Sequence, residues 1–82
     1  MVADHAAVES LLSALWCETL RIPQVSATDN FIDLGGNSLA AMRIASRVKD
    51  AYGVDVPMSV ILGDGTLREL SDALTRLLQQ QA

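Results

Sequence analysis

The chain has 82 residues, of which 50% are apolar, and its formal net charge is −4 at pH 7. This length indicates one domain with a modest core, because small domains bury a smaller fraction of their surface. The single cysteine excludes an internal disulfide, and no group of cysteines and histidines has metal-ligand spacing. The acidic charge argues against nucleic acid as a partner, and no apolar run is long enough to span a membrane.

The first ten residues do not combine a basic stretch with a following apolar stretch, so the sequence predicts no signal peptide. Trp16, Phe31 and Tyr52 are too few aromatic residues to form a stacking platform for single-stranded nucleic acid. We therefore expect a soluble, cytoplasmic monomer that binds neither membranes nor nucleic acids.

The first predicted helix covers residues 4–21. Apolar side chains recur there at spacings of three and four, which places them on one helical face: Val8, Leu11, Leu12, Leu15 and Trp16. Asp4 can cap the start of this helix, and Pro23 marks its end.

Residues 22–36 mix proline, serine, asparagine and glycine with scattered apolar residues, which predicts an irregular loop. A connection of this length without regular structure is unusual in a compact domain and tends to be functional. We expect the loop to be ordered, because Val25, Phe31, Ile32 and Leu34 can hold it against the helices, with Phe31 and Leu34 pointing inward.

The second predicted helix covers residues 37–52 and ends at Gly53, a residue typical of helix C-termini. One face of this helix is apolar and consists of Ala41, Ile44, Ala45, Val48 and Tyr52. Leu39 and Met42 lie beside that face, near the N-terminal end of the helix.

Residues 57–62 predict a short helical segment, since Pro57 suits the first position of a helix. The segment also contains enough valine and isoleucine for a strand, but no partner strand is visible in the sequence. Asp64 and Gly65 resemble a hairpin signal, yet they lack flanking alternating residues and are better interpreted as a loop.

The last predicted helix covers residues 66–80. Thr66 and Glu69 fit the capping box, in which each side chain accepts a hydrogen bond from a backbone N–H at the helix start. The apolar stripe consists of Leu67, Leu70, Leu74, Leu77 and Leu78. The sequence therefore predicts an all-α, four-helix bundle with three longer helices, a short third helix and a long loop between the first two.

Two glycines and a serine stand where the loop leads into the second helix. Gly35 and Gly36 allow a sharp turn and leave room for close approach, and Ser38 lies in the first turn of the helix. The helix dipole favours an anion there, which makes a phosphate-bearing attachment at Ser38 plausible. The lysine of a Walker loop and the G-x-S-x-G pattern of a nucleophile elbow are both absent. On the residues alone, the commoner role for Ser38 is that of an ordinary cap in a non-catalytic helical interaction domain.

The run "DNFIDLGGNSLAAMRI", residues 29–44, closely resembles the core motif of the peptidyl carrier proteins. These are the thiolation domains of nonribosomal peptide synthetases, within the acyl-carrier-protein-like superfamily. The residues that match the family pattern are Asp29, Phe31, Ile32, Leu34, Gly35, Gly36, Ser38 and Leu39. The resemblance extends over the whole chain, so residues 1–82 are expected to form a single carrier domain.

The resemblance implies that Ser38 carries a covalent 4′-phosphopantetheine, which a phosphopantetheinyl transferase takes from coenzyme A. The thiol of that group would hold an aminoacyl, peptidyl, aryl or acyl thioester between partner enzymes. Those partners would be an adenylation enzyme and condensation, tailoring or thioesterase enzymes. The domain itself would have no catalytic residue and no metal, and would serve antibiotic or other secondary metabolism.

The resemblance also implies a partner surface around Ser38. Its expected members are Gly36, Asn37, Leu39, Met42, Arg43, Met58 and Ile61. For Leu39, Met42, Met58 and Ile61 the alternative is a place in the core, because all four are apolar residues on predicted helices.

Several features bear on the carrier subclass. Asn37 precedes Ser38, where fatty-acid carriers usually have aspartate, and the second helix carries more basic than acidic residues. Both features are typical of the peptidyl type. The segment before Thr66 departs from the commoner peptidyl ending, so an aryl or polyketide-hybrid carrier stays open. A free-standing protein and a piece of a larger synthetase stay open as well.

The remaining chemically active residues have simpler interpretations. Cys17 has no base or cationic partner nearby in the sequence to activate its thiol, so we expect a small packed side chain rather than an acyl-transfer thiol. His5 is expected to be an exposed terminal residue. Asp29 and Asp33 can assist a metal-dependent transferase in trans, or more simply hydrogen-bond to their own loop backbone.

Overall fold

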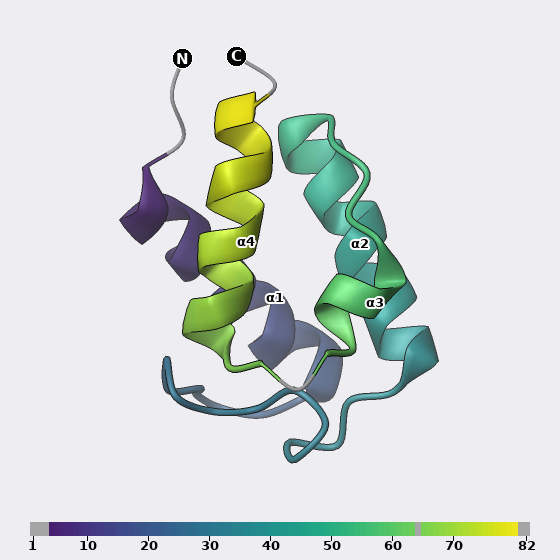
Figure 1. Ribbon diagram of the computed structural model, residues 1–82. Helices are drawn as coiled ribbons and strands as arrows, with labels where there is room; N and C mark the ends of the chain where they lie inside the picture. The colour runs from purple at the N-terminus through teal and green to yellow at the C-terminus, as the bar shows by residue number, and fades with distance from the viewer. Residues whose placement is uncertain (1–3, 64, 81–82) are drawn as a thin grey trace.

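The computed structural model describes residues 4–63 and 65–80, and the described chain forms four helices joined by loops (Figure 1). The helices are α1 (His5–Leu20), α2 (Ser38–Tyr52), α3 (Met58–Ile61) and α4 (Leu67–Gln80). The only β-type pairing among the described residues is an isolated bridge between Asn30 and Thr66. The predicted all-α bundle with a short third helix is therefore confirmed.

Helix boundaries follow the capping residues that the sequence shows. The Asp4 side chain accepts from the Ala6 N–H at the start of α1, and Gly53 ends α2 in the left-handed conformation with φ of 72°. At the start of α4, Glu69 Oε1 accepts from Thr66 N at 3.1 Å and Thr66 Oγ1 accepts from Glu69 N at 3.3 Å. These three predictions are confirmed.

Two details of the boundaries differ from prediction. Pro57 precedes α3 as its N-cap residue instead of occupying its first position. Arg21, which we predicted as the last residue of the first helix, lies just beyond α1 and takes the left-handed conformation, with φ of 57° and ψ of 47°. Asp64, which we predicted to lie in a loop, is outside the described residues, and Gly65 is not helical.

The core lies between α1, α2 and α4, with α3 packed against α2 and α4. Its largest buried side chains are Trp16, Phe31, Leu12, Ile44 and Leu74. Phe31 is the loop's contribution to this core, and its ring lies 5.2 Å from that of Trp16, centroid to centroid. Leu34 is half-buried and packs against the same core, so both predicted inward-facing loop residues have that role.

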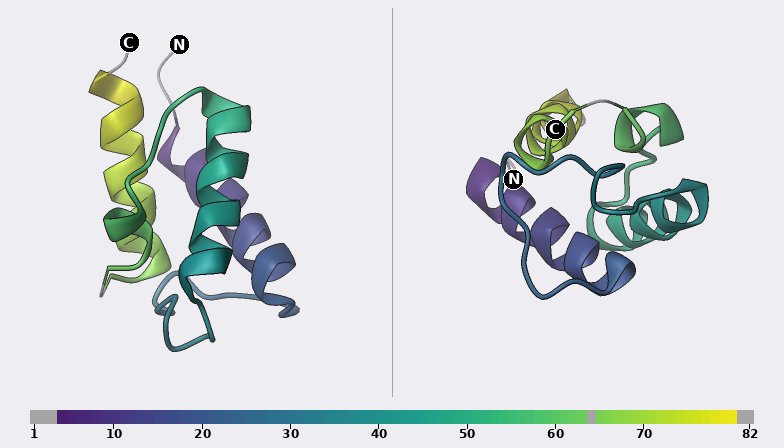
Figure 2. Two further views of the ribbon diagram at one scale, coloured as in Figure 1. Left: turned by 90° about the vertical axis from the view of Figure 1, so that its right-hand side faces the viewer. Right: turned by 90° about the horizontal axis from the view of Figure 1, so that it is seen from below.

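The long loop crosses the end of the bundle where α2 and α4 begin (Figure 2). Its carbonyl groups accept hydrogen bonds from the first N–H groups of α4: Leu67 N donates to Asp29 O and Arg68 N to Ala27 O, each at 2.9 Å. Asn30 Nδ2 also donates to Gly65 O at 3.2 Å. The first turn of a helix leaves its N–H groups without partners inside the helix. These bonds therefore supply acceptors for the first N–H groups of α4 and at the same time hold the loop in place.

Within the described residues, no helix combines the length and apolarity that crossing a membrane requires.

Candidate functional site

Ser38 is the first residue of α2, and its side chain is exposed at the loop end of the bundle. The capping group of this helix belongs to its neighbour: Asn37 Oδ1 accepts from Ala40 N at 2.9 Å. The Ser38 hydroxyl forms no hydrogen bond or other polar interaction with any described residue. The alternative in which Ser38 serves only as the helix cap is therefore wrong, because Asn37 already occupies that role.

The two glycines before this helix have different local requirements. Gly35 has φ of 94°, a conformation that side-chain-bearing residues rarely adopt, and open space surrounds the position where a Cβ would lie. Gly36 has an ordinary φ but lies against Phe31, and its N–H donates to Phe31 O at 2.9 Å. Gly36 therefore faces the loop's own aromatic side chain, which limits what a partner could touch there.

An exposed apolar surface borders Ser38. Leu39 and Met42 are 57% and 58% exposed, which resolves the open choice between core and surface in favour of the surface. Asn37 and Arg43 are exposed beside them. Ile32 of the long loop is 47% exposed, so it does not hold the loop against the helices as we expected. A signal for this exposure was present, because its neighbour Phe31 points inward and adjacent residues of a turn face different directions.

The short helix α3 contributes less to this surface than we expected. Met58 is half-buried and packs against the core. Ile61 is 3% exposed, so including it in the partner surface was wrong. A single-turn helix packed on both α2 and α4 directs its last apolar residue into the core.

Other polar groups have structural partners. Arg47 pairs with Glu18 and Lys49 with Asp55, both at 2.8 Å. Asp29 Oδ2 accepts from Ser26 N at 2.8 Å, which is the local loop bond that we expected for this residue.

The remaining candidate residues add no second site. His5 is half-buried and contacts Asp72 of α4, so it links two helices instead of being the exposed terminal residue that we expected. Asp33 is exposed, and Cys17 is a half-buried free thiol. Across residues 4–63 and 65–80, no three acidic, histidine or cysteine side chains gather as a metal site would require.

A free hydroxyl at the start of an exposed helix, bordered by apolar side chains on a helical bundle, is the arrangement of a carrier. Residues 10–74 match the family model described as the phosphopantetheine attachment site, and the chain belongs to this family. It is a carrier protein of the acyl-carrier-protein-like superfamily, whose prosthetic group is 4′-phosphopantetheine from coenzyme A.

Individual relatives are similar in both sequence and structure. Tyrocidine synthase 3 of Brevibacillus parabrevis is 40% identical over 70 residues, which cover 85% of this chain but only 1% of that protein. The structure of BlmI, a type-II acyl carrier protein from Streptomyces verticillus involved in bleomycin biosynthesis, has a TM-score of 0.83 at 31% identity, covering 90% of this chain and 89% of BlmI.

A second similar structure is a complex of the phosphopantetheine transferase Sfp with coenzyme A and a peptidyl carrier protein. The match has a TM-score of 0.80 at 33% identity and covers 93% of this chain and 99% of the matched chain. Relatives of this kind therefore include both small carriers and short segments of very large synthetases.

Proposed function

We propose that Ser38 is the attachment residue for 4′-phosphopantetheine and that residues 1–82 form one peptidyl carrier domain of nonribosomal peptide synthesis. The observation that carries this proposal is the division of labour between Asn37 and Ser38. Asn37 caps α2, so the exposed Ser38 hydroxyl has no structural partner and is available for chemistry.

The residues around Ser38 fit a phosphodiester. Ser38 Oγ would bond to the phosphorus that carries the pantetheine, and the bond from that phosphorus to the rest of coenzyme A would break. Adenosine 3′,5′-bisphosphate leaves, and a base on the transferase takes the hydroxyl proton. The position of Ser38 in the first turn places the resulting negative charge at the positive end of the helix dipole.

The attached group supplies a terminal thiol that holds an acyl group as a thioester. This chain contributes the exposed attachment point and a recognition surface made of Asn37, Leu39, Met42 and Arg43. Exposed apolar groups gathered in one area mark interaction sites on small soluble proteins, because a monomer gains nothing from leaving them in water. The domain itself then needs no catalytic residue.

The peptidyl type is favoured by the charge of α2, which carries Arg43, Arg47 and Lys49 against Asp50. The synthetases among the relatives are consistent with this assignment. In this function the domain works in the cytoplasm with a transferase, an adenylation enzyme and condensation, tailoring or thioesterase enzymes.

The test is to incubate the purified chain with coenzyme A and a promiscuous phosphopantetheinyl transferase and to measure its mass. We expect a gain of one phosphopantetheine, which Ser38→Ala abolishes. Ser10→Ala is the matched control, because Ser10 is an exposed serine of α1 away from the start of α2, and it should be modified normally. No gain in a folded wild-type sample, or an undiminished gain in Ser38→Ala, would contradict the assignment.

A further inference from the structure

A groove follows the seam between α1 and α2 beside Ser38. Its mouth has a volume of about 200 Å³ and is bordered by Arg21 from the end of α1 and by Asn37, Leu39 and Arg43 from the start of α2. A second hollow of about 260 Å³ shares Arg43 with the first and continues along the seam. Since Asn37 and Leu39 are the chain neighbours of Ser38, an enzyme that reaches the Ser38 hydroxyl also covers this mouth.

The groove is cationic in a molecule that is acidic overall. The chain has six basic and ten acidic residues, yet three of its arginines, Arg21, Arg43 and Arg47, line the two hollows with Glu18 as the one acidic lining residue. Glu18 is already paired with Arg47 at 2.8 Å. Arg21 and Arg43 form no ion pair with any described residue. Their charges are therefore available to an anionic partner.

The backbone of Arg21 supports a role for its side chain. Arg21 has left-handed angles, which glycine adopts without strain and other residues avoid. Strained positions tend to occur where function needs a particular side chain. A glycine would end α1 at least as well, but it would remove one of the two unpaired cations at the mouth of the groove.

The opposite flank of α1 has a different character. The groove there is formed by α1, the long loop and the start of α4, and Glu9 is its charged lining residue. Glu9 Oε1 is buried without a hydrogen-bond partner among the described residues. An acidic partner would be repelled on that side and attracted on the side of Ser38, so the charge distribution can orient it.

We propose that the α1–α2 groove is a docking site for an acidic segment of the phosphopantetheinyl transferase that modifies Ser38; this inference rests on the proposed function. Carboxylates of the transferase pair with Arg21 and Arg43, while Leu39 and Met42 supply the apolar contact. Charges at the rim of an interface chiefly affect association rate and salt dependence, and such steering changes rates by roughly 10- to 1,000-fold. The groove therefore positions Ser38 for modification without taking part in the chemistry.

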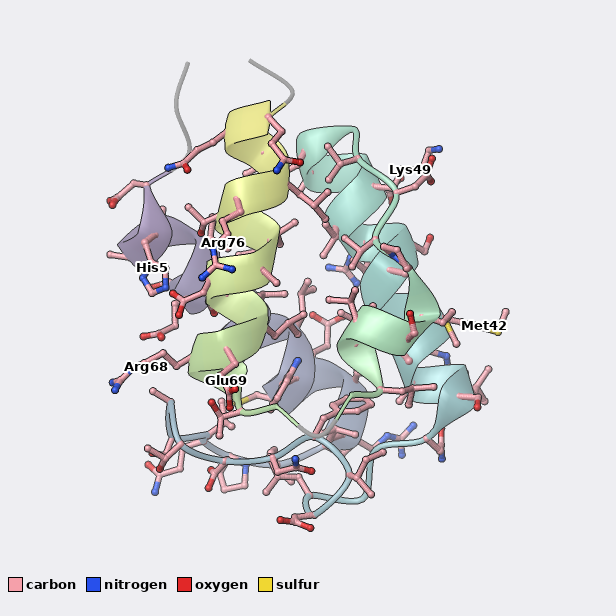
Figure 3. The ribbon with its side chains drawn as sticks, viewed as in Figure 1. His5, Met42, Lys49, Arg68, Glu69 and Arg76 are labelled. Carbon is pink, nitrogen blue, oxygen red and sulfur yellow. The ribbon has the colours of Figure 1, made fainter. Side chains whose placement is uncertain are left out.

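The test compares two double charge reversals of the full chain, with Sfp and coenzyme A as the probe. Arg21→Glu/Arg43→Glu changes the groove. Arg68→Glu/Arg76→Glu is the matched control, because it changes net charge equally at two exposed arginines of α4, on the side of the molecule away from Met42 (Figure 3). For the groove variant we expect KM for the carrier to rise about tenfold or more at low ionic strength, with kcat changed by less than about threefold. The control should stay within about twofold of the wild type.

Salt dependence provides a second readout. At about 1 M salt the Debye length falls to about 3 Å, so the difference between the two variants should nearly disappear. Equal KM values for both variants at low salt, or a difference that high salt leaves intact, would overturn the docking site.

Two controls keep the outcomes separate. Failure of the wild-type chain to gain phosphopantetheine would overturn the proposed function itself, whereas normal modification of all variants overturns only the docking site. If circular dichroism shows that the groove variant is unfolded, the KM of Arg43→Gln, at an exposed residue of α2, is compared with that of Arg76→Gln, at an exposed residue of α4. Equal KM values for Arg43→Gln and Arg76→Gln at low ionic strength would overturn the inference as well.

Discussion

Gly36 lies directly against Phe31: a Cβ atom built on Gly36 would be 2.4 Å from Phe31 Cδ2 and 2.7 Å from the Phe31 carbonyl oxygen. The carbonyl belongs to the backbone and cannot rotate away. The absence of a side chain at Gly36 thus allows the loop to fold over its own aromatic residue immediately before α2 begins.

The first prediction is that Gly36→Ala destabilises the protein by about 1–3 kcal/mol, as overpacking of a tight site does. Because Phe31 also contacts Trp16, the only tryptophan, the substitution should change the fluorescence of the folded state. Urea unfolding followed by Trp16 emission measures both effects. Gly53→Ala is the control, since it strains a left-handed glycine in open space and should leave the emission of the folded state unchanged. An unchanged spectrum in Gly36→Ala would contradict the contact.

The second prediction separates the cap from the attachment residue. Asn37→Ala should cost about 1 kcal/mol of unfolding free energy, because Ala40 N loses its acceptor at the start of α2. Ser38→Ala should change stability by less than about 0.5 kcal/mol, as exposed substitutions without structural partners do. Thermal or urea unfolding of the two variants tests this. A larger loss in Ser38→Ala than in Asn37→Ala would return the capping role to Ser38.

The third prediction compares two adjacent residues of the loop. Phe31→Ala should lower stability by about 3–5 kcal/mol, since it removes a fully buried aromatic ring and leaves a cavity. Ile32→Ala should stay within about 0.5 kcal/mol of the wild type, because the Ile32 side chain is already largely in water. Chemical denaturation gives both values. Similar losses in the two variants would mean that the loop packs differently.

The fourth prediction concerns the exposed apolar surface. Met42→Asp should preserve the helical circular dichroism signal, because Met42 is 58% exposed, and should raise KM for transferase modification by at least about fivefold. The loss follows from placing a charge where a partner would bury an apolar group. Ala51→Asp, at an exposed position near the other end of α2, adds the same charge and should be modified normally. Loss of helix content in Met42→Asp would instead place this residue in the core.

Side chains buried on α4 illustrate why some features could not be predicted. Ser71 and Thr75 are almost fully buried, and their hydroxyls donate to the carbonyls of Leu67 and Ser71, at 2.8 and 2.7 Å. We made no prediction for either residue, and a hydroxyl that bonds within its own helix can be buried at little cost. The leucine stripe predicted the centre of the buried face of α4. The full width of that face, which includes Ser71 and Thr75, depends on how closely the neighbouring helices pack.

The order of residues was enough to predict the four helices, most of their ends and the motif around Ser38. These features depend on interactions between residues a few positions apart, such as the bonds of Asn37 to Ala40 and of Thr66 to Glu69, and a one-dimensional pattern contains them. The packed chain was needed to learn that Met42 faces water while Ile61 is buried, and that the arginines of α1 and α2 meet in one groove. Those outcomes depend on contacts between segments that are distant in the chain. Helical periodicity cannot predict such contacts, because it does not specify which element covers each face of a helix.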